Sequence, residues 1–448
     1  MKIGLVECRY KTPFIQAVAQ QMHIDEETWL VQNSRFSPHG AKGIYQLNHP
    51  AGRVARKSGS GPKNDIALLY SKKSDRFSRF YGAPTWWHND YYNQISIWLE
   101  KEAPNIVLGE LGSVHSHLVA LACEHAGIPF LNPSSSRYPP GRFAVFLGTR
   151  MIPLAGSAAH WSKDRLQVAV NQVNSGRSKP DYMNKLTASY TGIKTRALSL
   201  ADRFMFDWYE TPSLRRSIAN KNTQRIAHEI WETSCISLQS CNAVVNDSSL
   251  SVLYPLQMQP EMNLDIWGHQ WIDQSLLIKT LAISLQRQKG VLVIKPNPKS
   301  NLEIDSSLNS VIESCPNIIP LSHTVQMADV QNMCDITLTV SGSIAIEKLL
   351  HKQPVAILLS DYAHWLGVPS LDEVGYSPDS IDSSFVERVV KSQNSVNAID
   401  LISHLVETSY PGLISDPVLD PNVMSSVNVR LVAQGLCQAI AALNLPGD

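Results

Sequence analysis

The sequence predicts an α/β protein of two Rossmann-like domains, with a helical insertion in the first domain and closing helices at the carboxyl end. Its 448 residues are roughly two to three times the usual size of one domain. Short apolar runs alternate with helical patterns in both halves, which is typical of βαβ units and parallel sheets. A second series of such units begins near residue 240, so we expect two domains rather than one large one.

The first half alternates between buried strands and helices. Strands are expected at 2–8, 105–111 and 128–132, and helices at 13–22, 93–104 and 115–127. Residues 51–79 carry eight basic and two acidic residues among many Gly and Ser, which predicts a basic loop. Residues 177–225 return to helical periodicity with ten basic and four acidic residues. We expect this second segment to form the insertion that caps the first domain.

The second half repeats the alternation. Strands are expected at 251–257, 290–298, 317–321 and 335–340, with a long helix at 271–288. After about residue 380 the pattern is helical to the end. We therefore predict a first domain at 1–240, a second at 241–380, and closing helices at 381–448 that pack back on the first domain.

Composition excludes several classes of protein. Lys plus Arg and Asp plus Glu both number 39, and this balance argues against a general nucleic-acid binder. The seven cysteines contain no CxxC pair, so neither a disulfide framework nor a zinc site is indicated. The first residues do not form a signal peptide, and the apolar run at 144–159 is interrupted by Arg150 and Pro153. We expect a cytoplasmic protein, with contact to the cytoplasmic face of the inner membrane as an option.

A turn at residues 341–343 predicts an anion site. A β-branched run ends there, Ser341, Gly342 and Ser343 form the turn, and a helix begins at once. Helix amino ends offer unpaired N–H groups and a positive dipole, and a glycine between hydroxyls lets a phosphate approach closely. The alternative is that Ser343 only caps the helix. Glu347, one turn into the helix, is expected to bind ribose hydroxyls or to be solvated.

Two further segments end strands with polar residues. The run KPNPK displays Lys295, Asn297 and Lys299 at a strand's carboxyl end, where open α/β sheets bind ligands, although most such turns only terminate strands. The loop after PLQ holds amides and carboxylates, and from it we select Gln257, Glu261 and Asp265. Glu261 or Asp265 is expected to be a base, a nucleophile or an orienting group, and the alternative is that Asp265 or Asp273 caps the next helix.

Taken in order, these three segments resemble the carboxyl-terminal half of bacterial capsule and lipopolysaccharide-type GT-B glycosyltransferases, including the retaining Kdo transferases of capsule assembly. The likeness covers roughly residues 251–367. It implies a GT-B fold, with two Rossmann-like domains facing across a cleft, the donor in the second domain and the acceptor in the first. It also implies that Ser341, Gly342 and Ser343 hold the nucleotide phosphate, Glu347 the nucleoside, and Lys295 and Asn297 the donor phosphate. Glu261 takes the place of the family's acidic nucleophile, whereas Asn297 replaces the histidine of the family's KPHP motif.

The first half supplies residues for the acceptor. Glu110 follows a predicted strand and is a candidate acid or base. Arg137 and Arg142 follow the next strand and could bind a sugar carboxylate, or be ordinary loop residues. Three further residues are expected either to contact sugar or to pack in the core, namely His115, Trp86 and Trp87. A metal at His115 and His117 is disfavoured, because residues two apart do not share a helix face.

The sequence thus predicts a glycosyltransferase that moves a sugar, with Kdo from a CMP donor as the first choice, onto a polysaccharide or lipid-linked glycan. Retention is expected if Glu261 is the nucleophile and inversion if Glu110 is the base. No cofactor and no metal are expected, because helix N–H groups and lysines can stabilise the leaving phosphate. The alternatives are a nucleotide-sugar 2-epimerase and a non-catalytic subunit that binds nucleotide sugar or glycan.

Overall fold

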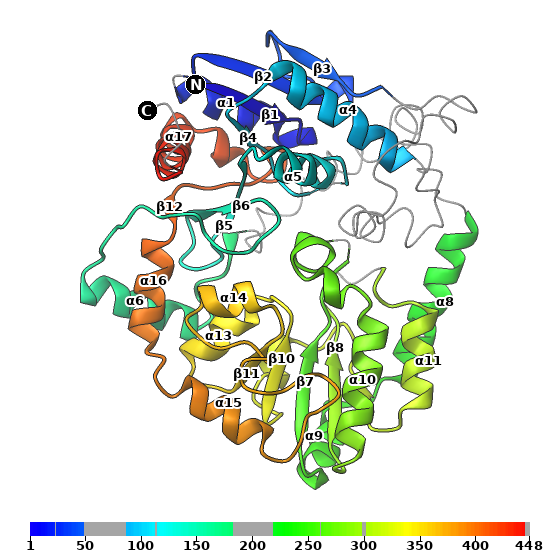
Figure 1. The fold of residues 1–448 in the computed structure, drawn as a ribbon. Coiled ribbons are helices and arrows are strands. Elements are labelled where there is room, and N and C mark those ends of the chain that lie inside the picture. Colours follow the sequence, from blue (N-terminus) through cyan, green and yellow to red (C-terminus); the bar gives the residue numbers. More distant parts are fainter. Residues whose placement is uncertain are drawn as a thin grey trace. The chain divides into compact units, whose positions relative to one another are not determined.

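The computed structural model describes residues 1–22, 24–48, 87–112, 114–181, 218–259, 261–297 and 302–443. The chain divides into two compact units, Met1–Arg215 with Ile402–Asp448, and Arg216–Leu401. Figure 1 shows that each unit contains its own sheet with helices packed against it. The predicted basic loop lies outside the described residues, as does most of the predicted insertion.

The first unit is built on one sheet of seven strands in the order β12-β6-β5-β4-β1-β2-β3. Its strands are β1 (Lys2–Val6), β2 (Glu26–Val31), β3 (Ile44–Gln46), β4 (Ile106–Leu108), β5 (Phe130–Ser135), β6 (Arg142–Leu147) and β12 (Tyr410–Pro411). Five neighbouring strands, from β3 to β5, pair in parallel. The last two, β6 and β12, pair antiparallel. The predicted parallel α/β sheet is confirmed, and it carries an antiparallel edge.

Helices cover both faces of this sheet. They are α1 (Thr12–Gln21), α4 (Trp87–Glu102), α5 (Val114–Ala126) and α17 (Ser426–Ala441). The unit also contains α6 (Lys163–Asn174), and α16 (Ala398–Glu407) leads into β12. Ile3 and Leu5 of β1 pack in one core with α1 and α17, which lie side by side in Figure 1. Between them, Gly4 faces α4, and a Cβ added there would lie 2.9 Å from the Trp98 ring. Alternation along β1 therefore assigns one face to α1 and α17 and the other to α4.

The second unit has a sheet of five strands, all parallel, in the order β11-β10-β7-β8-β9. Its strands are β7 (Ser251–Pro255), β8 (Val291–Lys295), β9 (Ile318–Pro320), β10 (Ile336–Thr339) and β11 (Val355–Ile357). Every residue in these strands is buried, as expected for a parallel sheet covered on both faces. Its helices are α8 (Ile218–Ser234), α9 (Leu238–Asp247), α10 (Gln274–Gln286), α11 (Ser306–Ser314), α12 (Met327–Val330), α13 (Ile344–Leu350), α14 (Ser360–Trp365) and α15 (Phe385–Gln393).

The parallel strands of both units follow the same order. Counted along the chain within each unit, the parallel strands lie 3-2-1-4-5, which is the order of a Rossmann half. The order reverses between the first and fourth strands, at β1 and β4 in the first unit and at β7 and β10 in the second. Ligands of open α/β sheets bind outside the carboxyl ends of the strands at this switch point. The fold thus marks one position in each unit where function is expected.

The division of the chain differs from the predicted boundaries at 240 and 380. Helix α8 belongs to the second unit because Trp231 Nε1 donates to Leu321 O at 3.2 Å and Asn309 Nδ2 donates to Ala227 O at 2.9 Å. Helix α15 also stays with the second unit, where Gln393 Oε1 accepts from Val355 N at 3.3 Å. The return to the first unit therefore begins at Ile402.

Candidate functional site

The switch point of the second unit brings together two of the predicted segments. Gln257 follows β7, and the turn 341–343 follows β10, the neighbouring parallel strand. The Gln257 side chain is 9 % exposed and donates through Nε2 to Thr339 Oγ1 at 3.2 Å. Residues 82 positions apart in the sequence are thus joined at the carboxyl edge of the sheet.

Gln274, at the start of α10, organises the loop after β7. Its side chain is 2 % exposed, and Oε1 accepts from Gln257 N at 2.9 Å and from Tyr254 OH at 3.1 Å. Its Nε2 donates to Gln257 O at 2.9 Å and to Gln259 Oε1 at 3.1 Å. A buried amide with donor and acceptor both satisfied fixes the backbone around it. The loop therefore leaves β7 in one conformation.

Thr339, the last residue of β10, connects this network to the turn. Its Oγ1 accepts from Gln257 Nε2 and from Gly342 N, the latter at 3.1 Å. A Cβ on Gly342 would lie 2.9 Å from Thr339 Oγ1 and 3.2 Å from Gln257 Nε2. Glycine is therefore required at 342 by the close approach of these two side chains. The Gly342 N–H points to Thr339, so this donor is already engaged within the protein.

The two serines of the turn differ in their contacts. Ser341 is fully buried, and its Oγ donates to Asn263 O at 3.1 Å. Ser343 is partly exposed, and within the described part of the chain its side chain makes no capping hydrogen bond to α13. Ser343 thus occupies the N-cap position of α13 without a side-chain capping bond. Glu347 is partly buried on the first turn of α13.

Glu261 and Asp265, the two carboxylates of the loop after β7, make different hydrogen bonds. Asp265 is 6 % exposed, with Oδ1 accepting from Gln259 Nε2 at 2.8 Å and Oδ2 from Glu261 N at 2.9 Å. Both oxygens of Asp265 thus hold the loop, which suits the orienting role among those predicted for it. Glu261 Oε2 accepts from Asn263 Nδ2 at 3.1 Å. Since Asn263 O also accepts from Ser341, one residue links Glu261 to the turn. Asp273 caps α10 by accepting from Leu276 N at 3.1 Å. The alternative that Asp273 caps this helix is confirmed.

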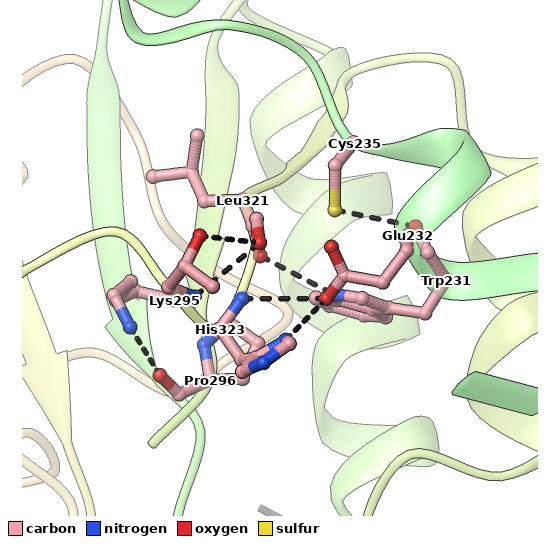
Figure 2. A network of polar contacts seen from close by, with 9 residues as sticks. Trp231, Glu232, Cys235, Lys295, Pro296, Leu321 and His323 are labelled. Carbon is pink, nitrogen blue, oxygen red and sulfur yellow. Dashed lines mark hydrogen bonds and ion pairs between the residues drawn. The ribbon is translucent and has the colours of Figure 1, made fainter. Parts of the chain in front are cut away.

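Lys295 ends β8 at the same edge of the sheet. Strand β7 lies between β8 and β10, and Pro255 pairs with Lys295, so two strand spacings, about 10 Å, separate Lys295 from the strand that carries the turn. The Lys295 segment and the turn 341–343 therefore do not follow neighbouring strands. Figure 2 shows the Lys295 ammonium donating to Pro296 O. Burial lowers the pKa of Lys295 to about 8, although the charge of Glu232 acts in the opposite direction.

Glu232 comes from α8 and pairs with a histidine that follows β9. His323 Nδ1 lies 2.6 Å from Glu232 Oε1, as Figure 2 shows. Although burial opposes it, hydrogen bonds from His323 and Ser322 hold the pKa of Glu232 below its usual range. Lys295 thus lies beside a polar cluster at the ends of β8 and β9. Asn297 is partly exposed just beyond it, and Lys299 lies outside the described residues.

The switch point of the first unit holds Glu110. Both of its carboxylate oxygens lie 2.6 Å from Lys11 Nζ, and Cys8 Sγ lies 3.5 Å from Oε2. Cys8 and Lys11 follow β1, and Glu110 follows β4, the neighbouring parallel strand. Burial alone would lower the pKa of Lys11, but the Glu110 carboxylate outweighs it and raises that pKa above its ordinary value. The Lys11 ammonium therefore stays charged near neutral pH.

The other residues predicted to contact the acceptor are used inside the first unit. His115 is 2 % exposed and bonds through Nε2 to Glu7 O at 3.1 Å. Trp87 is 1 % exposed and packs edge-on against Tyr91, so its ring cannot stack on a sugar. Trp86 lies outside the described residues. Arg137 is buried with its backbone in the left-handed region, at φ 71°.

Arg142 has a structural role in the first unit. Its guanidinium donates to Ser409 Oγ at 2.8 Å, Ser409 O at 2.6 Å, Val406 O at 2.7 Å and Ser157 Oγ at 2.9 Å. These bonds attach the end of α16 to β6. In this structure the donors of Arg142 are directed at the chain's own oxygens.

Several residues of the two switch points were not predicted from the sequence. Lys11 lies between β1 and α1. Ligands of α/β sheets often bind at this position, so Lys11 could have been predicted as a binding residue. Thr339 and Gln274 carry no motif of their own, and their importance arises from contacts with distant residues. Among the described residues, no group of three or more His, Cys, Asp or Glu side chains could hold a metal ion. No helix in the described ranges is long and apolar enough to cross a membrane.

The sequence matches no known family model and no curated protein. Solved structures with a similar fold include Staphylococcus aureus MnaA with UDP, at 13 % identity and TM-score 0.29 over 100 % of this chain and 98 % of that one. Another is the UDP-GlcNAc 2-epimerase of Neisseria meningitidis bound to UDP-GlcNAc, at 12 % identity and TM-score 0.23 over 98 % and 100 %. A third is Thermosulfurimonas dismutans KpsC, a beta Kdo 2,4 transferase, at 10 % identity and TM-score 0.33 over 68 % and 80 %. At these scores the likeness does not establish a function for this chain.

Proposed function

We propose that this chain is a nucleotide-sugar-dependent glycosyltransferase of GT-B architecture. The second unit would bind the nucleotide sugar, with a CMP-activated acidic sugar such as Kdo as the first choice, and the first unit would bind a glycan or lipid-linked saccharide acceptor. Two α/β units with the same strand order, each with charged or polar groups at its switch point, suit a reaction with two substrates.

The observation that carries the proposal is the turn 341–343. Its backbone is held by Thr339 and Gln257, glycine is required at its centre, and the Ser343 hydroxyl makes no capping bond within the described residues. This turn presents a hydroxyl at the carboxyl edge of a parallel sheet, which suits a phosphate. Because the turn is already ordered, binding a phosphate costs little conformational entropy of the protein. In this proposal the turn stabilises the leaving phosphate without a metal or cofactor.

Two carboxylates are candidates for the chemistry. Glu261 is joined to the turn through Asn263, which suits a nucleophile near the donor and a retaining mechanism. Glu110, paired with Lys11 in the first unit, suits a base for an acceptor hydroxyl and an inverting mechanism. We favour Glu261, and the stereochemistry of the product decides between them.

The first test is nucleotide binding by thermal shift with CMP, UDP and GDP, because a ligand of the native state raises its melting temperature. We expect CMP to stabilise the chain, and stabilisation by UDP or GDP would reassign the donor. If none of the three nucleotides binds, the proposal is wrong.

Activity is tested with the matching nucleotide sugar and mixed glycan acceptors. Glu261→Gln should abolish transfer while nucleotide binding persists, whereas Glu313→Gln, at an exposed position on α11, should leave transfer unchanged. Turnover of UDP-GlcNAc without any acceptor would instead identify a 2-epimerase. Nucleotide binding with no turnover, unaffected by Glu261→Gln or Glu110→Gln, would identify a non-catalytic subunit.

A further inference from the structure

The first unit contains an apolar cavity of about 30 Å³ beside Glu110. Its walls come from α1, from the end of β4 and from α17, and they include Phe14, Val18, Leu108, Val432 and Leu436. Among the described residues, the charged side chains that line it are those of Lys11 and Glu110. The cavity and the ion pair therefore form one site at the switch point of the first sheet.

The size and lining of the cavity restrict what can occupy it. One water needs roughly 10–15 Å³ by the same measure, so the cavity has room for a group of about that size, and its accessible lining is almost wholly apolar. A methyl group is about the size of a water molecule and needs no hydrogen bond. The cavity thus fits a methyl-sized apolar group, whereas a hydroxymethyl group would place a hydroxyl among aliphatic side chains.

We propose that this cavity binds the methyl group of a methyl-bearing sugar on the acceptor, a deoxy sugar or an N-acetyl sugar, while a hydroxyl of the same sugar contacts Glu110. This inference rests on the proposed function, because it specifies the acceptor of that reaction. Lys11 acts as a positioning residue, since its ammonium holds both oxygens of Glu110 at 2.6 Å beside the cavity. Selectivity for the acceptor follows from the cavity and not from the nucleotide site in the second unit.

Matched sugar pairs test the inference on the whole native chain. The p-nitrophenyl glycosides of L-rhamnose and L-mannose differ only in the presence of a 6-hydroxyl, as do those of L-fucose and L-galactose. The glycosides of N-acetylglucosamine and N-formylglucosamine differ only in a methyl group. Isothermal titration should give a Kd about tenfold lower for the methyl-bearing sugar, either in the deoxy pairs or in the N-acyl pair. The deoxy and N-acetyl arms then identify the source of the methyl group.

Variants at one position link the preference to the cavity. Ile414 is a partly buried residue of its wall, and Ile414→Phe fills the space. The preference should fall to less than twofold in this variant. Ile24→Phe is the matched control, because Ile24 is a partly buried isoleucine on the same core that does not line the cavity. If Ile414→Phe does not fold, Ile15→Phe on α1 gives the same test.

Xenon provides a readout that needs no variant. In methyl NMR spectra of the native chain, xenon should shift the resonances of Val432 and Leu436, and the methyl-bearing sugar should displace it. Equal Kd values within every sugar pair, or a preference that survives filling of the cavity, would overturn the inference. Failure of the proposed function has a different signature, because nucleotide binding would be lost while the sugar preference stayed intact.

Discussion

The hydroxyl of Thr339 holds the turn of the second unit, and its removal gives a quantitative prediction. Thr339→Val keeps the shape of the side chain but deletes an oxygen that accepts from Gly342 N at 3.1 Å and from Gln257 Nε2 at 3.2 Å. A buried donor left without an acceptor costs about 1–3 kcal/mol. Gln257 Nε2 retains a long contact to Pro255 O at 3.4 Å, so its cost lies at the low end of that range. We expect the free energy of unfolding of the second unit to fall by about 2–4 kcal/mol.

Urea unfolding measures this change, with amide hydrogen exchange of peptides from Arg216–Leu401 reporting the second unit. Thr337→Val is the matched control, because Thr337 is also buried on β10 and its hydroxyl takes no part in the network. We expect the control to change the free energy of unfolding by less than about 1 kcal/mol. Thr339→Val should also weaken CMP binding at least tenfold, since the turn loses its fixed conformation.

Equal unfolding free energies for Thr339→Val and Thr337→Val would refute the reasoning, because the hydroxyl would then hold nothing. A destabilised Thr339→Val that binds CMP with unchanged affinity would separate the turn from the nucleotide site.

Three further predictions follow from individual side chains. Ser343→Ala should weaken nucleotide binding about tenfold and change the free energy of unfolding by less than about 0.5 kcal/mol, because the Ser343 side chain makes no capping bond within the described residues. Burial lowers the pKa of Lys295 to about 8 in the folded chain, whereas a lysine in the unfolded chain has a pKa of about 10.5. Between these two pH values the unfolded chain binds a proton that the folded chain has lost. The free energy of unfolding therefore rises with pH in this window. In Lys295→Met, urea unfolding across this window should show that rise reduced by up to about 3 kcal/mol, and an unchanged rise would contradict the shift. Arg142→Met should lower the free energy of unfolding by about 3 kcal/mol or more, because four hydrogen bonds are lost, and should leave nucleotide affinity unchanged. Arg165→Met, at an exposed arginine, is its control in the same urea titration.

The central strands could be predicted from the sequence, because a parallel sheet buried on both faces leaves continuous apolar runs. The runs at 251–257, 290–298 and 335–340 correspond to β7, β8 and β10 with differences of at most three residues at an end. The sequence also predicted polar residues at the carboxyl ends of strands, but it did not predict the strand order that sets the switch points. The antiparallel edge strand β12 carries no comparable signal, because it has only two residues.

The roles of individual side chains were harder to predict, because they depend on contacts between distant parts of the chain. In the sequence, Arg142 resembles a ligand-binding arginine because it follows a predicted strand. Its structural role depends on hydrogen bonds to residues 406–409, which the sequence does not place beside it. Asp265 and Glu261 look equivalent in the sequence, and their hydrogen bonds distinguish them. Lys295 lies on the predicted edge, but the order of the strands puts β7 between it and the turn.

Hydrogen–deuterium exchange with and without CMP tests the central claim most directly, that a nucleotide binds at the carboxyl edge of the second sheet. We predict slower exchange in residues 339–347 and 255–265 when CMP is bound, and little change in the first unit. Protection confined to the first unit, or CMP binding that leaves both segments of the second unit unchanged, would contradict the account.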